Sequence, residues 1–138
     1  SMLGYKLEMN DIQAAIGLGQ LPHLDADNTI RKGIYQAYRS AGLPMTYMSY
    51  GSSHHLAVML VEDRQQKETI MSLLNKNQIQ TGCHYTPNYY YKMYNQCYRD
   101  NGCKNVEEFY QRCISLPCHL YLTNEDIDKI TTIINEVI

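Results

Sequence analysis

The sequence has no long apolar run, no extended run of basic residues and no secretory leader pattern at its start. No segment approaches the roughly 18 consecutive apolar residues that a membrane-spanning helix needs, so we expect no membrane partner. The longest basic run is Arg31-Lys32 and the net charge is −2, which leaves no electrostatic footprint for nucleic acid. A signal peptide would need a basic stretch followed by an apolar one, so we expect a cytoplasmic protein.

The common nucleotide-binding and hydrolase motifs are also missing from the sequence. There is no P-loop, no G-x-G-x-x-G, no G-x-S-x-G and no H-E-x-x-H. Gly17-Leu18-Gly19 lies within a helical pattern and therefore cannot cradle a phosphate. The acidic pairs Glu62-Asp63, Glu107-Glu108 and Glu125-Asp126 fall at predicted helix starts, where they complement the helix dipole. The residues indicate a binding surface without a complete catalytic set.

Five cysteines are present, an odd number with no C-x-x-C pair: Cys83, Cys97, Cys103, Cys113 and Cys118. A disulfide framework in a secreted protein would favour an even count, so we expect reduced thiols. A zinc site formed by the last four would lack the closely spaced ligand pairs that usually bind zinc. We therefore expect no metal.

Tyrosine is abundant, with 13 residues against one phenylalanine and no tryptophan. Six of the tyrosines lie between Tyr85 and Tyr98. Because tyrosine buries a ring while keeping a polar tip, this cluster indicates a half-wet surface such as a cleft wall or a subunit interface. A loop that is merely rich in tyrosine is the alternative.

The N-terminal third predicts two helices joined by a kink. Asn10 or Asp11 can cap the first helix, Pro22 interrupts the pattern, and Asp25 or Asp27 can start a second helix. Gly42 ends the second helix, so the pair should span about residues 10 to 41. Small residues on the first helix predict that it packs closely against something large.

The middle of the chain predicts a small α+β domain. The apolar run from His54 to Val61 suits a buried strand, and Asp63 can cap a helix that ends near Asn77. The β-rich stretch Ile79–Tyr85 predicts a second strand, and residues from Thr46 onward are candidates for a third.

The C-terminal part predicts two further helices around an extended segment. Asn105 can cap a helix from Val106 to Cys113, and ISLPCHLYL (114–122) after it is extended and stopped by Pro117. Thr123 and Asp126 form a capping-box pattern at the start of an amphipathic last helix. The whole chain therefore predicts one α+β domain.

Two histidine-containing pairs are candidates for reactive sites. Neighbouring residues in a strand point to opposite faces, so His54 and His55 should lie one at the core edge and one in solvent. The same argument excludes a nucleophilic dyad of Cys83 and His84. Two interpretations of His84 stay open: a hydrogen-bond donor to a ligand, or a structural histidine at a strand end.

Four segments together resemble one known family. GYKLEMNDIQAAIGLGQL (residues 4–21) resembles the segment that follows the catalytic-lysine region of DegT/DnrJ/StrS-type sugar aminotransferases. IQTGCHYTP (79–87) is similar to the family's I-x-T-G-x-H-Y-x-P, and CISLPCHLYLTNEDIDKI (113–130) to its S-L-P-x-x-x-x-L-T-x-E-D-x-D-x-V segment. HHLAVMLVEDR (54–64) is similar to the strand and helix cap between them. Together they cover nearly the whole chain.

The resemblance implies a fold-type I enzyme that depends on pyridoxal phosphate, with a large cofactor domain followed by a small C-terminal domain. Residues 1–22 would be the connecting loop and helix from the large domain, and residues 23–138 the small domain. The expected fold class is α+β: a short antiparallel sheet of about three strands, packed with helices and preceded by a long kinked connecting helix.

The resemblance also implies where ligands bind. Tyr5, Lys6 and Glu8 would lie at the rim of the partner subunit's pyridoxal phosphate, because the family's loop reaches across the interface of a homodimer. The family commonly has Asn where Lys6 stands and Arg or Asn where Glu8 stands. His84 and Tyr85 would lie near a nucleotide-sugar substrate.

The implied activity is transfer of an amino group from glutamate to a nucleotide-linked keto sugar. None of the seven lysines matches the context of the Schiff-base lysine on which this chemistry depends. We therefore expect no catalytic residue, no bound cofactor and no transamination in this chain alone. Two alternatives stay open: a free-standing dimerisation or ligand-binding module, and the small domain of a related sugar dehydratase.

Overall fold

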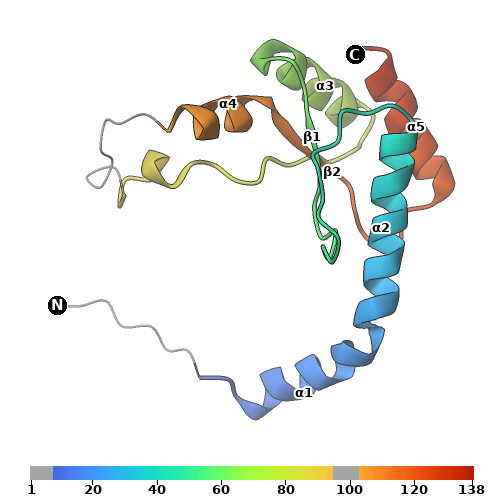
Figure 1. Cartoon of the computed structure of the whole chain (residues 1–138), viewed down its shortest axis with the longest axis vertical. Coiled ribbons are helices and arrows are strands. Elements are labelled where there is room, and N and C mark those ends of the chain that lie inside the picture. The colour runs from blue at the N-terminus through green and yellow to red at the C-terminus, as the bar shows by residue number, and fades with distance from the viewer. Residues whose placement is uncertain (1–7, 95–102) are drawn as a thin grey trace.

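The computed structural model describes residues 8–94 and 103–138, in which a helical arm leads into a mixed domain (Figure 1). Its elements in chain order are α1 (Asp11–Gln20), the 3-10 turn η1 (Leu21–His23), α2 (Leu24–Ser40), β1 (Ala57–Leu60), α3 (Arg64–Lys76), the 3-10 turn η2 (Asn88–Tyr90), α4 (Lys104–Arg112), β2 (Cys113–Leu116) and α5 (Asn124–Asn135). The predicted α+β class is confirmed, but the sheet of the described residues has two strands where about three were expected. Within the described residues, no helix has the length and apolar character needed to cross a bilayer.

Asn10 begins the helical arm. Its side-chain oxygen accepts a hydrogen bond from Gln13 N at 2.9 Å, and the Gln13 side chain accepts one from Asn10 N at 3.1 Å. This reciprocal pair satisfies two backbone donors that have no partner inside the helix. Pro22 lies in η1, where the arm bends before α2 continues. The predicted kinked pair of helices is confirmed.

α2 begins at Leu24, slightly before either predicted cap. The N-cap residue is His23, whose side chain makes no capping hydrogen bond, while Asp25 and Asp27 lie in the first turn. The prediction of an aspartate cap is therefore wrong, although both carboxylates still complement the helix dipole there. Gly42 follows the helix with a φ of 88°, the left-handed conformation that favours glycine.

The sheet is short and antiparallel. β1 pairs with β2, and one isolated antiparallel bridge flanks the pair on each side. The paired and bridging residues are Ala57–Leu116, Val58–Ser115, Met59–Ile114, Leu60–Cys113, Met45–Met59 and Gly82–Ser115.

The predicted strand over Ile79–Tyr85 is wrong. Only Gly82 bridges β2, exchanging both backbone hydrogen bonds with Ser115 at 3.0 and 2.8 Å. Beyond Gly82 the chain leaves the ladder, and the His84–Tyr85 peptide bond is cis. The strand partner of β1 is instead β2, which starts directly where α4 ends.

Two of the three later helix caps are as predicted. Asp63 caps α3 and Thr123 caps α5, each side chain accepting a hydrogen bond from a backbone N–H three residues on. The prediction of Asn105 as the cap of α4 is wrong, because Cys103 holds the N-cap position and Asn105 lies inside the helix.

The core lies between the sheet and helices α2, α3 and α5 (Figure 1). Tyr38 and Met59 are its largest fully buried side chains, and the Tyr38 hydroxyl donates to Pro117 O at 2.9 Å. The remaining core residues are Ile34, Leu43, Ala57, Val61, Ile70, Leu74, Ile114, Leu116, Ile127, Ile130 and Ile134.

α1 lies outside this core. The arm projects from the end of α2 away from the sheet (Figure 1), and α1 has no buried residue. Ile12, Ile16 and Leu18 keep 73%, 62% and 71% of their surface exposed. The small residues that predicted close packing thus face no covering element among the described residues.

Candidate functional site

An open cleft of about 780 Å³ lies beside β2. Residues 77–82 form one side, residues 115–119 of β2 and the turn after it form another, and α5 contributes Asp126 and Lys129. His84 also lines the cleft. A fourth part of the chain, His55 and Leu56, also lines it, so the folded sheet brings together residues that are far apart in sequence.

His84 is fixed in this cleft by the strand beneath it. Its Nδ1 lies 2.8 Å from the hydroxyl oxygen of Ser115, a buried residue of β2. The Gly82–Ser115 bridge places that serine directly below the loop. Because Nδ1 is held by Ser115, the opposite ring nitrogen, Nε2, is the polar atom that remains for a ligand.

Tyr85 does not share the cleft with its neighbour. Its side chain is 70% exposed and does not line the cavity. The ring packs edge-on against the imidazole of His84, with ring centroids 4.8 Å apart. Of the two predicted substrate residues, the structure therefore brings only His84 into the cleft.

Other polar side chains of the cleft were not singled out as site residues by the sequence. His55, Ser115, His119 and Lys129 line it, and their proximity depends on strand pairing, which no local motif announces. The pKa of the Asp126 carboxyl is held below its usual range by hydrogen bonds from Thr123. That carboxylate therefore serves the helix cap.

The prediction that one of the two adjacent histidines lies at the core edge and the other in solvent is confirmed. His54 is buried and its Nδ1 lies 2.8 Å from Ser52 O, whereas His55 is exposed. Across residues 8–94 and 103–138, no three His, Cys, Asp or Glu side chains gather closely enough to hold a metal ion.

The tyrosine-rich loop is fastened to α4. The Tyr89 hydroxyl donates to Glu107 Oε1 at 2.6 Å, and the Tyr90 hydroxyl donates to Glu107 Oε2. Together the two bonds hold the pKa of the Glu107 carboxyl below its usual range, and the bond that Tyr89 donates raises the pKa of Tyr89. Tyr90 also packs edge-on against Tyr110 of α4, at 5.8 Å between centroids. The sequence predicted that the tyrosine cluster forms a partly solvated surface. At Tyr89 and Tyr90 this surface is a contact between the loop and α4.

The N-terminal site residues lie mostly beyond what the structure describes. Tyr5 and Lys6 are outside the described residues, and Glu8 is exposed just before α1. Because α1 projects away from the sheet (Figure 1), the chain does not bring the start of the arm to the cleft that holds His84.

Comparison with known proteins places this fold. The chain matches the DegT/DnrJ/EryC1/StrS aminotransferase family over residues 1–135. It belongs to this family. The resemblance seen in the four sequence segments, including the small-domain fold that it implied, is thereby confirmed.

Two curated relatives show how much of a family member the chain represents. It is 29% identical over 150 residues to the spore coat polysaccharide biosynthesis protein SpsC of Bacillus subtilis, covering 98% of this chain and 38% of the relative. It is 31% identical over 137 residues to the UDP-4-amino-4,6-dideoxy-N-acetyl-β-L-altrosamine transaminase of Helicobacter pylori, covering 93% and 36%. The chain thus spans well under half the length of these relatives.

Solved structures agree with this assignment. Helicobacter pylori PseC, an aminotransferase involved in the biosynthesis of pseudoaminic acid, superposes with a TM-score of 0.84 at 28% identity, covering 99% of this chain and 39% of that one. Spr1654 of Streptococcus pneumoniae, assigned as a sugar aminotransferase, superposes in its pyridoxal phosphate form with a TM-score of 0.81 at 27% identity, covering 97% and 38%.

Two of the described lysines have their amines engaged with backbone carbonyls. A Schiff base to the cofactor needs a lysine amine that is available within a site. Lys67 instead donates from Nζ to Tyr110 O at 2.6 Å, and Lys129 on the cleft wall donates to Asn77 O at 3.4 Å. These two amines are therefore not free to form that bond in this structure.

Proposed function

We propose that this chain is the C-terminal part of an aminotransferase that moves an amino group from glutamate to a nucleotide-linked keto sugar. The observation that carries the proposal is the match to the aminotransferase family over residues 1–135. A relative at 31% identity is a transaminase for a UDP-linked amino sugar, which supports a nucleotide-sugar substrate.

Residues 23–138 are proposed as the small domain and residues 1–22 as the connection to a large domain that holds pyridoxal phosphate. The cofactor, when bound, supplies the electron sink for amino transfer. The exposed apolar side chains of α1 support the proposed connection, because a helix with no buried residue gains stability only when another surface covers it.

The N-terminal loop is proposed to act across a homodimer. Tyr5, Lys6 and Glu8 would meet the rim of the partner subunit's cofactor phosphate. Lys6 suits this place as a point charge that binds phosphate. Glu8 carries the same sign of charge as the phosphate and would instead pair with a base or face the amino donor.

His84 and Tyr85 are proposed to contact the nucleotide-sugar. His84 can do so through Nε2, because Ser115 holds Nδ1 and fixes the ring. The exposed ring of Tyr85 offers a flat surface for a sugar or base to stack upon. A cytoplasmic location is proposed for the enzyme.

The experiment that tests the function uses the complete reading frame. The encoded protein is incubated with glutamate and a panel of nucleotide-linked keto sugars, and 2-oxoglutarate and amino-sugar products are measured. Amino transfer to at least one sugar is expected. Loss of water from the sugar without amino transfer would contradict the proposal and indicate a dehydratase.

The 138-residue chain itself gives a second test. After mixing with pyridoxal phosphate, reduction with borohydride and peptide mapping, we expect only scattered, substoichiometric labelling of surface lysines. Stoichiometric labelling of one lysine, with a visible absorbance band that vanishes on reduction, would show that the chain holds the cofactor by itself.

A further inference from the structure

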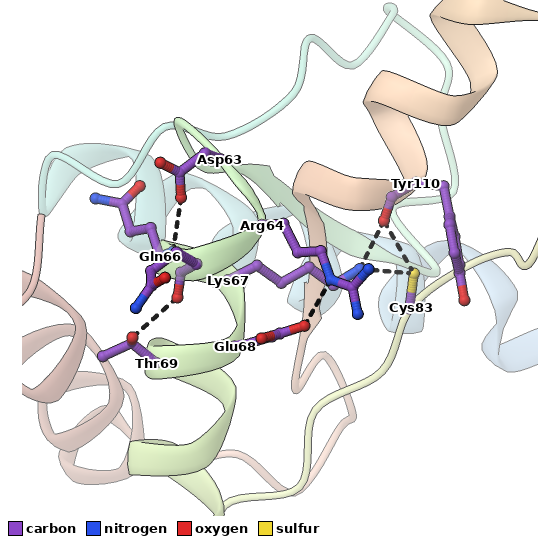
Figure 2. Close-up of polar contacts among 9 residues, drawn as sticks. Asp63, Arg64, Gln66, Lys67, Glu68, Thr69, Cys83 and Tyr110 are labelled. Carbon is purple, nitrogen blue, oxygen red and sulfur yellow. Dashed lines mark hydrogen bonds and ion pairs between the residues drawn. The ribbon is translucent and has the colours of Figure 1, made fainter.

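Two cysteines that are distant in sequence lie in contact next to a lysine. The Sγ atoms of Cys83 and Cys113 are 3.3 Å apart, and Nζ of Lys67 lies 3.3 Å from Sγ of Cys83. Figure 2 shows Lys67 reaching from α3 towards Cys83 and towards the backbone carbonyl of Tyr110. Three separate segments therefore converge on one sulfur.

The fold holds both sulfurs in this arrangement. Cys113 is the first residue of β2 and is completely buried. Cys83 directly follows Gly82, whose backbone is hydrogen-bonded to Ser115 of β2. The carbonyl of Tyr110 lies 3.8 Å from Sγ of Cys83 and 3.7 Å from Sγ of Cys113. A disulfide bond is about 2.05 Å long, so the two sulfurs need to approach by only a little over an ångström.

The two thiols differ in how they can react. Cys83 is partly exposed and has an ammonium group beside it, which stabilises negative charge on an attacking sulfur. Cys113 is inaccessible to solvent, and burial together with the hydrogen bond to Cys83 raises the pKa of its thiol to about 12. An external oxidant can therefore reach Cys83 first, and Cys113 can then react only with its neighbour.

We propose that Cys83 and Cys113 form a redox-sensitive thiol pair that closes to an intrachain disulfide when it meets a small disulfide such as oxidised glutathione. This inference does not depend on the proposed enzymatic activity. Reduced thiols, as the sequence predicts for the cytosol, are the resting state, and the disulfide forms when the thiol pool becomes oxidised.

The reaction has two exchange steps. The Cys83 thiolate attacks one sulfur of oxidised glutathione, which forms a mixed disulfide on Cys83 and releases one glutathione thiolate. Cys113 then loses its proton and attacks Sγ of Cys83, releasing the second glutathione. In total, the two cysteines are oxidised to a disulfide and one oxidised glutathione is reduced to two glutathione thiols. The two protons lost by the cysteines are taken up by these two glutathione thiols.

Closing this bond would tie the cleft loop to the sheet. Cys83 immediately precedes His84, and Cys113 is two residues before Ser115, which holds the imidazole of His84. The Sγ of Cys83 would also leave its position beside Lys67. Oxidation therefore links the thiol state of the cell to the position of the loop that carries His84.

The test uses the 138-residue chain and oxidised glutathione. After incubation, alkylation and digestion without reduction, mass spectrometry should find the Cys83 and Cys113 peptides joined, and dithiothreitol should separate them. The exposed Cys103 should carry at most a mixed disulfide with glutathione. A stable mixed disulfide on Cys83 without the cross-link, or a cross-link from Cys83 to another cysteine, would overturn the proposal.

Variants separate the role of Cys113, which closes the disulfide, from the role of Lys67, whose charge assists the attack by Cys83. Cys113→Ser and Cys113→Ala should both accumulate the glutathione adduct on Cys83, and two variants are used because one could fail to fold. Lys67→Met should slow the first step by about fivefold through loss of the neighbouring charge, while Lys76→Met at the exposed end of α3 should not. If Lys67→Met reacts at the unchanged rate, the ammonium has no part in the attack.

Discussion

The imidazole of His84 lies directly against Gly82. A Cβ atom at position 82 would stand 2.7 Å from Cε1 of the ring, closer than real Cβ atoms come to another atom, and 3.3 Å from Nδ1. The absence of a side chain at Gly82 is therefore what lets His84 reach Ser115.

Gly82→Ala should consequently push the His84 ring away from Ser115. The lost hydrogen bond should lower the free energy of unfolding by about 1 kcal/mol, as measured by urea denaturation, and the ring resonances of His84 should shift in NMR spectra. Gly17→Ala is the matched control, since a Cβ there meets nothing within 4 Å and alanine favours the helix. Unchanged His84 resonances in Gly82→Ala would contradict this account.

The two capping boxes of the chain should respond differently to mutation. Thr123→Ala removes the cap of a helix packed in the core and should lower the free energy of unfolding by about 1 kcal/mol. Asn10→Ala removes an equivalent cap from α1, which has no buried residue, so it should fray α1 without moving the global transition. Circular dichroism and tyrosine fluorescence, followed together during unfolding, distinguish the two outcomes.

The Thr123 cap also predicts a pH dependence. Hydrogen bonds from Thr123 keep the pKa of Asp126 lower in the folded chain than in the unfolded one. This stabilisation is fully present above the unfolded value of about 3.9 and is lost as the pH falls through the folded value. The stability gap between wild type and Thr123→Ala should therefore narrow below about pH 4. A gap that stays constant down to pH 2 would show that the carboxylate is not involved.

Glu107→Gln should loosen the tyrosine-rich loop from α4. In the wild type the hydrogen bond to Glu107, followed by burial, raises the pKa of Tyr89 above its usual range. In the variant Tyr89 should ionise closer to the ordinary value of about 10, as followed by NMR of the tyrosine rings during an alkaline titration. Glu108→Gln, one residue along α4, should leave the titration of Tyr89 as it is in the wild type.

The exposed face of α1 predicts that this chain self-associates. Uncovered apolar patches on a soluble protein drive association, and Ile12 and Ile16 lie on one side of the helix. Sedimentation velocity should show oligomers at high concentration, and Ile12→Lys with Ile16→Lys should shift them to monomers. Gln65→Lys with Ser72→Lys on exposed positions of α3 is the charge-matched control. A wild-type chain that stays monomeric at high concentration would contradict the prediction.

The caps were predictable because their information is local. Asn10, Asp63 and Thr123 each bond to a backbone N–H three residues away, so a short window of sequence contains both partners. The prediction of Asn105 as the cap failed for α4, because Asn105 stands inside the helix and the N-cap residue, Cys103, makes no side-chain hydrogen bond.

The sheet was harder to predict because strand pairing is not local. Ile79–Tyr85 has the alternation of a strand, yet only Gly82 bridges β2. An alternating apolar and polar pattern indicates that a segment suits an extended conformation. Whether that segment becomes a strand depends on which other segment lies beside it and forms backbone hydrogen bonds with it. The candidate site was only partly predictable for the same reason. His84 could be identified from its motif, but its hydrogen-bond partner Ser115 and the cleft that both residues line depend on the position of β2 in the sheet.

The pairing of β1 with β2 also constrains how the chain is made. β1 leaves the ribosome well before Cys113–Leu116, and the hydrogen bond from Tyr38 to Pro117 joins residues 79 positions apart. Until translation passes residue 117, Ala57–Leu60 is an apolar strand without its native partner, open to pairing with other chains. The speed of translation between β1 and β2, and the binding of chaperones to the exposed β1 during that time, should therefore determine how much of the protein is recovered folded.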